Sequence, residues 1–173
     1  MSVPSTTLAP SGYQTPERSD TGATVVGAKT SAMTALSEMS VTPTYAQVRQ
    51  LEAALLSMPQ IEPRYEHYVT GREYARVMHL NAGEVITGKR HRRASINIIA
   101  AGSFRSTGPD GAMRDMHAPY VFVSPPGMKK LIVALTDGTW VTVHASRMQD
   151  MSDLEFIESK VIEPEPPFSE VAP

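Results

Sequence analysis

The stretch that decides the fold is GKRHRRASINIIAAG, residues 88–102, in which five cationic or titratable side chains precede an apolar run. In a β-strand, successive side chains point to opposite faces of the sheet. This period places Ile96 and Ile98 on one face, and it places a polar set on the other: Lys89, His91, Arg93, Ser95 and Asn97. The stretch therefore predicts a strand with a polar side and an apolar side.

The same period of two recurs between Tyr65 and His144. Turn-forming residues separate the apolar runs at residues 81–83, 108–111, 125–127 and 137–138. The predicted strands lie in EYARVMHL (73–80), EVITGKRH (84–91), SINIIAAGSFRS (95–106), AMRDMHAPYVFV (112–123), KKLIVAL (129–135) and TWVTVHA (139–145). Short strands at this spacing favour an all-β sandwich or barrel. We assign that barrel to residues 60–147.

A single amphipathic helix is predicted immediately before the barrel, within residues 44–59. Thr44 and Gln47 have the spacing of a capping box, and Pro59 cannot continue the helix. Apolar residues recur at helical spacing in one stripe: Val48, Leu51, Leu55 and Met58. We expect this stripe to form an interface, most simply with the domain that follows.

The two ends of the chain have compositions typical of extended segments. Residues 1–43 are rich in Ser, Thr, Pro, Gly and Ala, which predicts either a disordered tail or an arm that orders only against a partner. Residues 148–173 predict a short helix over 152–162, begun by Ser152 and Glu155 as a capping box, and then an acidic Pro-rich tail. We expect the arm to gain order only in an assembly, and the tail to be flexible or extended.

The charge pattern does not favour nucleic acid or membranes as partners. The net charge is −2, but Lys and Arg outnumber Asp and Glu by 11 to 7 in residues 60–146, whereas the acidic residues lead by 7 to 2 in 147–173. No aromatic residue between Tyr74 and Phe104 accompanies the basic run, although single-strand binders normally combine both. The sequence contains no Cys, no signal-peptide pattern and no apolar run of the roughly 20 residues that a membrane span needs. We therefore expect neither disulfides nor secretion by a signal peptide.

Four pieces of the barrel segment resemble a known family: TGKRH, INIIAAG, YVFVSPPGMKK and WVTVH. Together with the order of the predicted strands, they are similar to the small cupin-like proteins encoded by tailed bacteriophages. The resemblance covers roughly residues 66–160. It implies a single cupin-like barrel, a double-stranded β-helix or jelly roll, and a phage setting.

The resemblance also marks the positions at which metal-binding cupins hold their ligands. Those cupins have two His two residues apart, then a Glu four residues later, and a third His three residues after the Gly of a PxG turn. In this sequence the four positions hold His91, Arg93, Asn97 and Lys130. Arg has no lone pair to offer a metal, and Lys must first lose a proton. We expect no metal and no other cofactor, and His144 is the remaining candidate for a displaced site.

The inward polar set has a second interpretation, a pocket for an anion such as a carboxylate or a phosphate. Several donors, Lys130 among them, would then meet at the mouth of the barrel. The alternative is that a carboxylate such as Glu84 or Asp115 pairs with these cations, as is usual for buried charges. We favour the paired arrangement.

The function that the sequence favours is a non-catalytic structural or interaction protein. The resemblance implies a virion component of the head-to-tail region, tail or fibres, assembled in the host cytoplasm. The apolar face with Ile96 and Ile98 must be covered by the helix, a second subunit or the N-terminal arm, so we expect homo-oligomers, and contacts with other virion proteins through the arm. The alternative is a metal- or anion-binding cupin enzyme or small-molecule sensor that uses His91, Asn97, Lys130 and His144.

Overall fold

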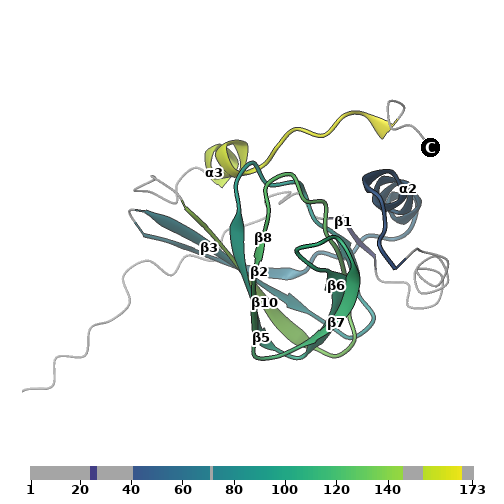
Figure 1. Ribbon diagram of the computed structural model, residues 1–173, viewed down its shortest axis with the longest axis horizontal. Coiled ribbons are helices and arrows are strands. Elements are labelled where there is room, and N and C mark those ends of the chain that lie inside the picture. Colours follow the sequence, from purple (N-terminus) through teal and green to yellow (C-terminus); the bar gives the residue numbers. More distant parts are fainter. Residues whose placement is uncertain (1–23, 27–40, 71, 146–153, 169–173) are drawn as a thin grey trace, which may run out of the picture.

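The computed structural model describes residues 24–26, 41–70, 72–145 and 154–168. Within them, ten strands form two five-stranded antiparallel sheets. Sheet A has the order β1 (Thr24–Val26), β4 (Val85–Thr87), β9 (Leu131–Ala134), β6 (Ser103–Thr107) and β7 (Met113–His117). Sheet B has the order β2 (Arg64–Val69), β3 (Glu73–Leu80), β10 (Gly138–Ala145), β5 (Ser95–Ala101) and β8 (Tyr120–Ser124). From β4 onward the chain passes repeatedly between the sheets (Figure 1), which confirms the predicted all-β, cupin-like jelly roll.

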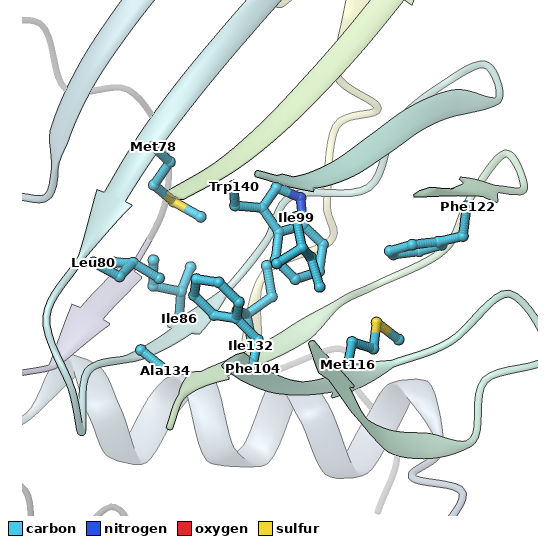
Figure 2. Packing of buried hydrophobic residues seen from close by; sticks show 10 residues of the cluster. All are labelled: Met78, Leu80, Ile86, Ile99, Phe104, Met116, Phe122, Ile132, Ala134 and Trp140. Carbon is cyan, nitrogen blue, oxygen red and sulfur yellow. The ribbon is translucent and has the colours of Figure 1, made fainter. Parts of the chain in front are cut away.

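The space between the two sheets is filled at one end of the barrel by an apolar core. Trp140 lies in the middle of this core (Figure 2), and the rings of Phe104 and Phe122 meet it edge-on with centroids 5.5 and 5.7 Å away. The remaining buried members come from both sheets: Met78, Leu80, Ile86, Ile99, Met116, Ile132 and Ala134. The predicted alternation produces this core, because every second side chain of a strand points inward.

Helix α2 (Tyr45–Leu56) packs on the outer face of sheet A and creates a second core. Its first turn carries the predicted capping box, in which the Thr44 hydroxyl accepts from the Gln47 backbone and the Gln47 side chain accepts from the Thr44 backbone. The stripe predicted for the helix is buried against β4 and β9, in one cluster of Val48, Leu51, Leu55, Val85, Leu131 and Val133. Strands β4 and β9 of sheet A are thus covered on both faces, which explains why the segment 129–135 lacks polar and apolar alternation.

The outer face of sheet B is apolar along β5 and β8, and α2 does not cover it. Ile96 is 46 % exposed, and Val121 and Val123 on the edge strand β8 are 62 % and 54 % exposed. Ile96 lies opposite Val123 in the register, and Ile98 lies opposite Val121. Of the three coverings that the sequence left open for Ile96 and Ile98, the structure therefore excludes the helix.

Residues 24–26 lie inside the segment 1–43, for which we expected order only in an assembly. They form β1, which pairs with all three residues of β4 in antiparallel register. The expectation is therefore wrong for these three residues, because a β-branched run adds itself to the free edge of β4 within the same chain.

The acidic C-terminal segment is extended, as expected, but it is attached to the barrel. Helix α3 (Leu154–Val161) lies within the predicted range, whereas Ser152 of the predicted capping box lies outside the described residues. Beyond α3, Glu163 pairs with Arg90 at 3.0 Å and Glu165 pairs with Lys129 at 2.8 Å. Figure 1 shows this segment crossing one end of the barrel from α3 toward α2. Of the two alternatives, a flexible or an extended tail, residues 162–168 follow the extended one, and their carboxylates neutralise cations of the barrel and of α2.

The two helices are short. Among the described residues, neither has the length and apolar character that crossing a membrane requires.

Candidate functional site at the polar end of the barrel

The barrel interior opposite the apolar core is polar and holds a small cavity. Side chains of both sheets and of the segment between β4 and β5 line it, among them Arg76, Lys89, His91, Lys130, Trp140 and Thr142. Ile86, Ile132 and Trp140 belong to both the cavity wall and the apolar core. The cavity is therefore polar on one side and apolar on the other, as small-ligand sites usually are.

Lys130 is buried in the wall of this cavity, with 5 % of its surface exposed. Desolvation lowers the pKa of its amine from the ordinary value of 10.5 to about 7, and the Arg76 guanidinium adds to this effect. Within the described parts of the chain, no ion pair joins Lys130, Arg76 or Lys89 to a carboxylate. The cavity is thus cationic without a fixed counter-charge.

The two carboxylates that the sequence offered as partners are used elsewhere. Glu84 accepts hydrogen bonds from the backbone and side chain of Asn81 in the turn after β3. Asp115 forms an exposed ion pair with Arg105 across β6 and β7. The paired arrangement that we favoured is therefore wrong for both residues, because local partners hold their carboxylates away from the cavity.

His91 lies in the wall of the cavity, and His144 lies beside it in an adjoining recess, with ring centroids 4.4 Å apart and the rings nearly perpendicular. Desolvation lowers the pKa of His91 to about 2 and that of His144 to about 3, and the charges of Lys130 and Arg76 act in the same direction. Both imidazoles are therefore neutral near pH 7. The predicted secondary position His144 joins His91, although the two are 53 residues apart in the sequence (144 − 91).

Asn97, at the position where a metal cupin has its Glu, is completely buried and occupied by structural hydrogen bonds. Its amide donates to the Ser124 hydroxyl at 2.9 Å. Its oxygen accepts from the Trp140 indole at 3.2 Å and from the Thr142 hydroxyl at 3.4 Å. Asn97 therefore joins β5, β8 and β10 beneath the cavity, and both of its polar atoms are engaged.

Arg93 does not belong to the site, and its predicted inward orientation is wrong. The side chain is exposed, and residues 88–94 form no strand apart from an isolated bridge between His91 and Ile162. The alternation of side chains holds only while the chain stays in the sheet. Because β5 begins at Ser95, parity cannot be counted back from Asn97 to Arg93.

Arg76 is the site residue that sequence reasoning missed. It lies on β3 between Tyr74 and Met78, which are buried, while Ala75 and Val77 face outward with partial exposure. The period of two in EYARVMHL therefore predicts that Arg76 lies on the same face of β3 as the buried residues Tyr74 and Met78. A cation at such a position is unusual enough to indicate a site.

The donor set does not fit the metal that this fold often carries. Of the four ligand positions, Arg93 is exposed, both polar atoms of Asn97 are engaged, and Lys130 is a competing cation. The described residues contain no group of three or more His, Asp or Glu that could hold a metal ion. The positive charge of Arg76 beside His91 and His144 would further oppose a divalent cation.

The C-terminal segment closes the mouth of this end of the barrel. Val161 and Ile162 line a small recess together with Tyr74, Arg76, His91 and His144. The Arg92 backbone donates to the Val161 carbonyl at 2.8 Å, and the Glu163 backbone donates to the Arg90 carbonyl at 2.9 Å. Arg90 and Arg92, in the basic run before β5, thus hold the C-terminal segment through backbone hydrogen bonds, while His91 faces the cavity.

The fold is that of a cupin-like barrel, and of the four ligand positions that the sequence resemblance marks, only His91 holds a metal-binding side chain. No protein-family model and no curated protein matches the sequence. Similar solved structures include an RmlC-like cupin from Shewanella frigidimarina, with 16 % identity, coverage of 53 % of this chain and 79 % of that one, and a TM-score of 0.43. KdgF from a Halomonas species has 22 % identity, coverage of 51 % and 83 %, and a TM-score of 0.44. An acetylacetone dioxygenase from Acinetobacter johnsonii has 9 % identity, coverage of 47 % and 58 %, and a TM-score of 0.39. At these identities the likeness concerns the fold alone.

Proposed function

We propose that the protein binds a small organic carboxylate in the barrel cavity. The observation that carries this proposal is that the buried Lys130 and the half-buried Arg76, whose guanidinium lies 5.5 Å from the centre of the Tyr65 ring, line one cavity, and that neither forms an ion pair with a carboxylate among the described residues. A buried charge normally has a partner, because its removal from water costs several kcal/mol. A bound carboxylate would supply that partner. This favours the small-molecule-binding alternative of the sequence analysis over a purely structural role.

Binding should be coupled to proton uptake near neutral pH. The pKa of Lys130 is lowered to about 7 by burial and by Arg76, so the amine is only partly protonated there. A carboxylate nearby favours the protonated form and raises this pKa. We therefore expect the affinity for a carboxylate to fall as the pH rises above about 7. Calorimetry in two buffers of different ionisation enthalpy measures the protons taken up.

The test is a titration of lactate, with inorganic phosphate for comparison, into the wild-type protein and the variants Arg76→Met and Lys130→Met. Each variant removes one charge-assisted hydrogen bond, so we expect lactate affinity to fall by about 10- to 100-fold. Arg105→Met is the matched control, because Arg105 pairs with Asp115 on the exposed surface. Equal lactate affinity in the wild type and Arg76→Met would contradict the proposal, and tighter binding of phosphate would contradict the carboxylate class.

The exposed outer face of sheet B favours a second role, self-association. Ile96, Val121 and Val123 form an uncharged, exposed cluster on neighbouring strands, and a second copy of the chain offers the same apolar surface in return. Light scattering of wild type and Val123→Lys tests this role. A monomer at every concentration in the wild type, or an unchanged oligomer in the variant, would exclude this face.

The virion location and the arm-mediated contacts stay predictions from the sequence resemblance. Mass spectrometry of purified phage particles tests them, because a structural component must be present in the particle.

A further inference from the structure

We infer that Lys130 is a nucleophile that forms an imine with the carbonyl carbon of a short 2-oxo acid, of the size of glyoxylate or pyruvate, bound in the barrel cavity. The inference rests on the proposed anion pocket, in which Arg76 binds the carboxylate. The carbonyl of a 2-oxo acid is directly bonded to its carboxylate carbon, so an acid held by Arg76 brings its carbonyl to the same small cavity as Lys130.

Two adjacent lysines show why Lys130 is the reactive one. Lys129 points out of the barrel, and its amine donates to Glu52 at 2.9 Å and to Glu165 at 2.8 Å. Lys130 points the opposite way, into a cavity with Ile132 and Trp140 in its wall. None of the described carboxylates forms an ion pair with it. One amine is therefore fixed as a paired cation, whereas the other is free to attack a bound ligand.

The surroundings of Lys130 also supply the neutral amine that imine formation requires. The groups that share its cavity are cationic or neutral: Arg76 from β3, Lys89 and His91 from the segment before β5, and Thr142 from β10. Before a carboxylate binds, burial and the charge of Arg76 lower the Lys130 pKa to about 7, so about half of the amine is neutral at pH 7. A bound carboxylate raises this pKa, so in the complex the neutral fraction of the amine, and with it imine formation, should increase with pH. At the ordinary value of 10.5, only about one in 3,000 would be neutral. Desolvation and a neighbouring cation are the usual means of activating a lysine nucleophile.

The reaction conserves atoms and needs no oxidant or reductant. The nitrogen lone pair of Lys130 forms a bond to the carbonyl carbon while the carbonyl π bond breaks, and a proton passes from nitrogen to oxygen to give a carbinolamine. The carbon–oxygen bond then breaks, the oxygen leaves with a second proton as water, and a carbon–nitrogen double bond remains. The product is a Lys130 imine that carries the carboxylate of the acid next to Arg76.

The test is reductive trapping of the full-length protein with pyruvate and cyanoborohydride, followed by intact-mass and tandem mass spectrometry. We expect one reduced adduct, on Lys130, formed at least about 10-fold faster than at the exposed Lys160. The adduct should be absent from Lys130→Arg and Lys130→Met. It should persist in Lys89→Arg, which keeps the charge of the second cavity lysine. Labelling at Lys89, or at surface lysines with equal rates, would overturn the inference.

Lactate separates a failure of this chemistry from a failure of the pocket, because it has the carboxylate of pyruvate but no carbonyl. Lactate binding without a pyruvate adduct would overturn the imine and leave the anion pocket intact. Absence of both would overturn the pocket and the imine together. Lactate binding in the wild type, with a pyruvate adduct that is lost only in the Lys130 variants, would support both.

Discussion

Replacing each of the two adjacent lysines by methionine should change the stability of the protein in opposite directions. Met is close to Lys in length and has no charge, so both variants remove a buried cation while the side-chain volume is nearly kept. The two cations differ in their partners, since Lys129 has two carboxylates and Lys130 has none among the described residues.

For Lys129→Met the expected effect is a loss of about 3–5 kcal/mol, the usual cost of removing one partner from a buried ion pair. The Lys129 side chain is only 2 % exposed, and its partners Glu52 and Glu165 are 8 % and 13 % exposed. Arg49 still pairs with both carboxylates in the variant. One cation then faces two nearly buried negative charges, so the loss should not be compensated locally.

For Lys130→Met the expected effect is a gain in stability at low and neutral pH. Burial lowers the Lys130 pKa from 10.5 to about 7, a difference of about 3.5 pH units, and each unit corresponds to about 1.4 kcal/mol. The folded state therefore binds this proton less tightly than the unfolded state, and the penalty reaches at most about 5 kcal/mol. It is fully present below about pH 7 and disappears as the pH rises through 10.5. Since structural relaxation reduces the cost of burying a charge in proteins, we expect a gain of about 2–5 kcal/mol.

Urea unfolding of wild type and both variants at about pH 6 and about pH 10 measures these differences through the free energy of unfolding. The stability advantage of Lys130→Met should shrink between the two conditions, because at pH 10 the folded wild type no longer buries a charged amine and the unfolded state has itself begun to lose this proton. A Lys130→Met variant that is as unstable as Lys129→Met at pH 6 would refute the argument, because it would mean that Lys130 has a stabilising partner.

Three further substitutions test the scaffold around the pocket. Asn97→Ala should lower the free energy of unfolding by about 2–3 kcal/mol, measured in urea, because the buried Trp140 indole loses its acceptor. Gly102→Ala should destabilise the fold by at least about 2 kcal/mol: Gly102 has a φ of 80°, and an added Cβ would lie 2.4 Å from the Asp137 carbonyl. An unchanged melting temperature would contradict that geometry. Glu165→Gln should increase proteolysis of the C-terminal segment, since the ion pair with Lys129 is lost; cleavage at the wild-type rate would exclude Glu165 as its anchor.

The elements that could be predicted from the sequence are those with an uninterrupted periodic pattern. The sequence of the helix at 45–56 contains both an apolar stripe and a capping box. In β3, β5 and β10, buried and more exposed side chains alternate, as expected for strands with one buried face. Strand β9 could not be assigned a face in this way, because α2 covers the side that would otherwise be polar. Long-range packing of this kind has no local signal in one sequence.

The site was predicted only in part, for the same physical reason. Lys130, His91 and Asn97 were found because a resemblance marked their positions, and two of the three line the cavity. The prediction for Arg93 was wrong because the alternation of side chains between the two faces does not continue through residues 88–94, which form no strand. The position of Arg76 follows from the alternation of β3, but one sequence does not show that the inner face of β3 meets the end of β9 where Lys130 lies.

The C-terminal segment pairs with the basic run at 88–93 but not with the cations of the cavity. A partly buried cation destabilises the fold least where it can pair with a carboxylate. On the outside of the barrel, Arg90 pairs in this way with Glu163 of the C-terminal segment. That segment lies across the mouth, so its carboxylates neutralise the outward cations, while Val161 and Ile162 are the parts that face the pocket. Arg76 and Lys130 consequently stay unpaired among the described residues, although acidic side chains lie close by in the fold. An arrangement that leaves the buried Lys130 and the half-buried Arg76 without a carboxylate partner among the described residues weakens the fold, and the anion that we propose for this cavity would offset the cost.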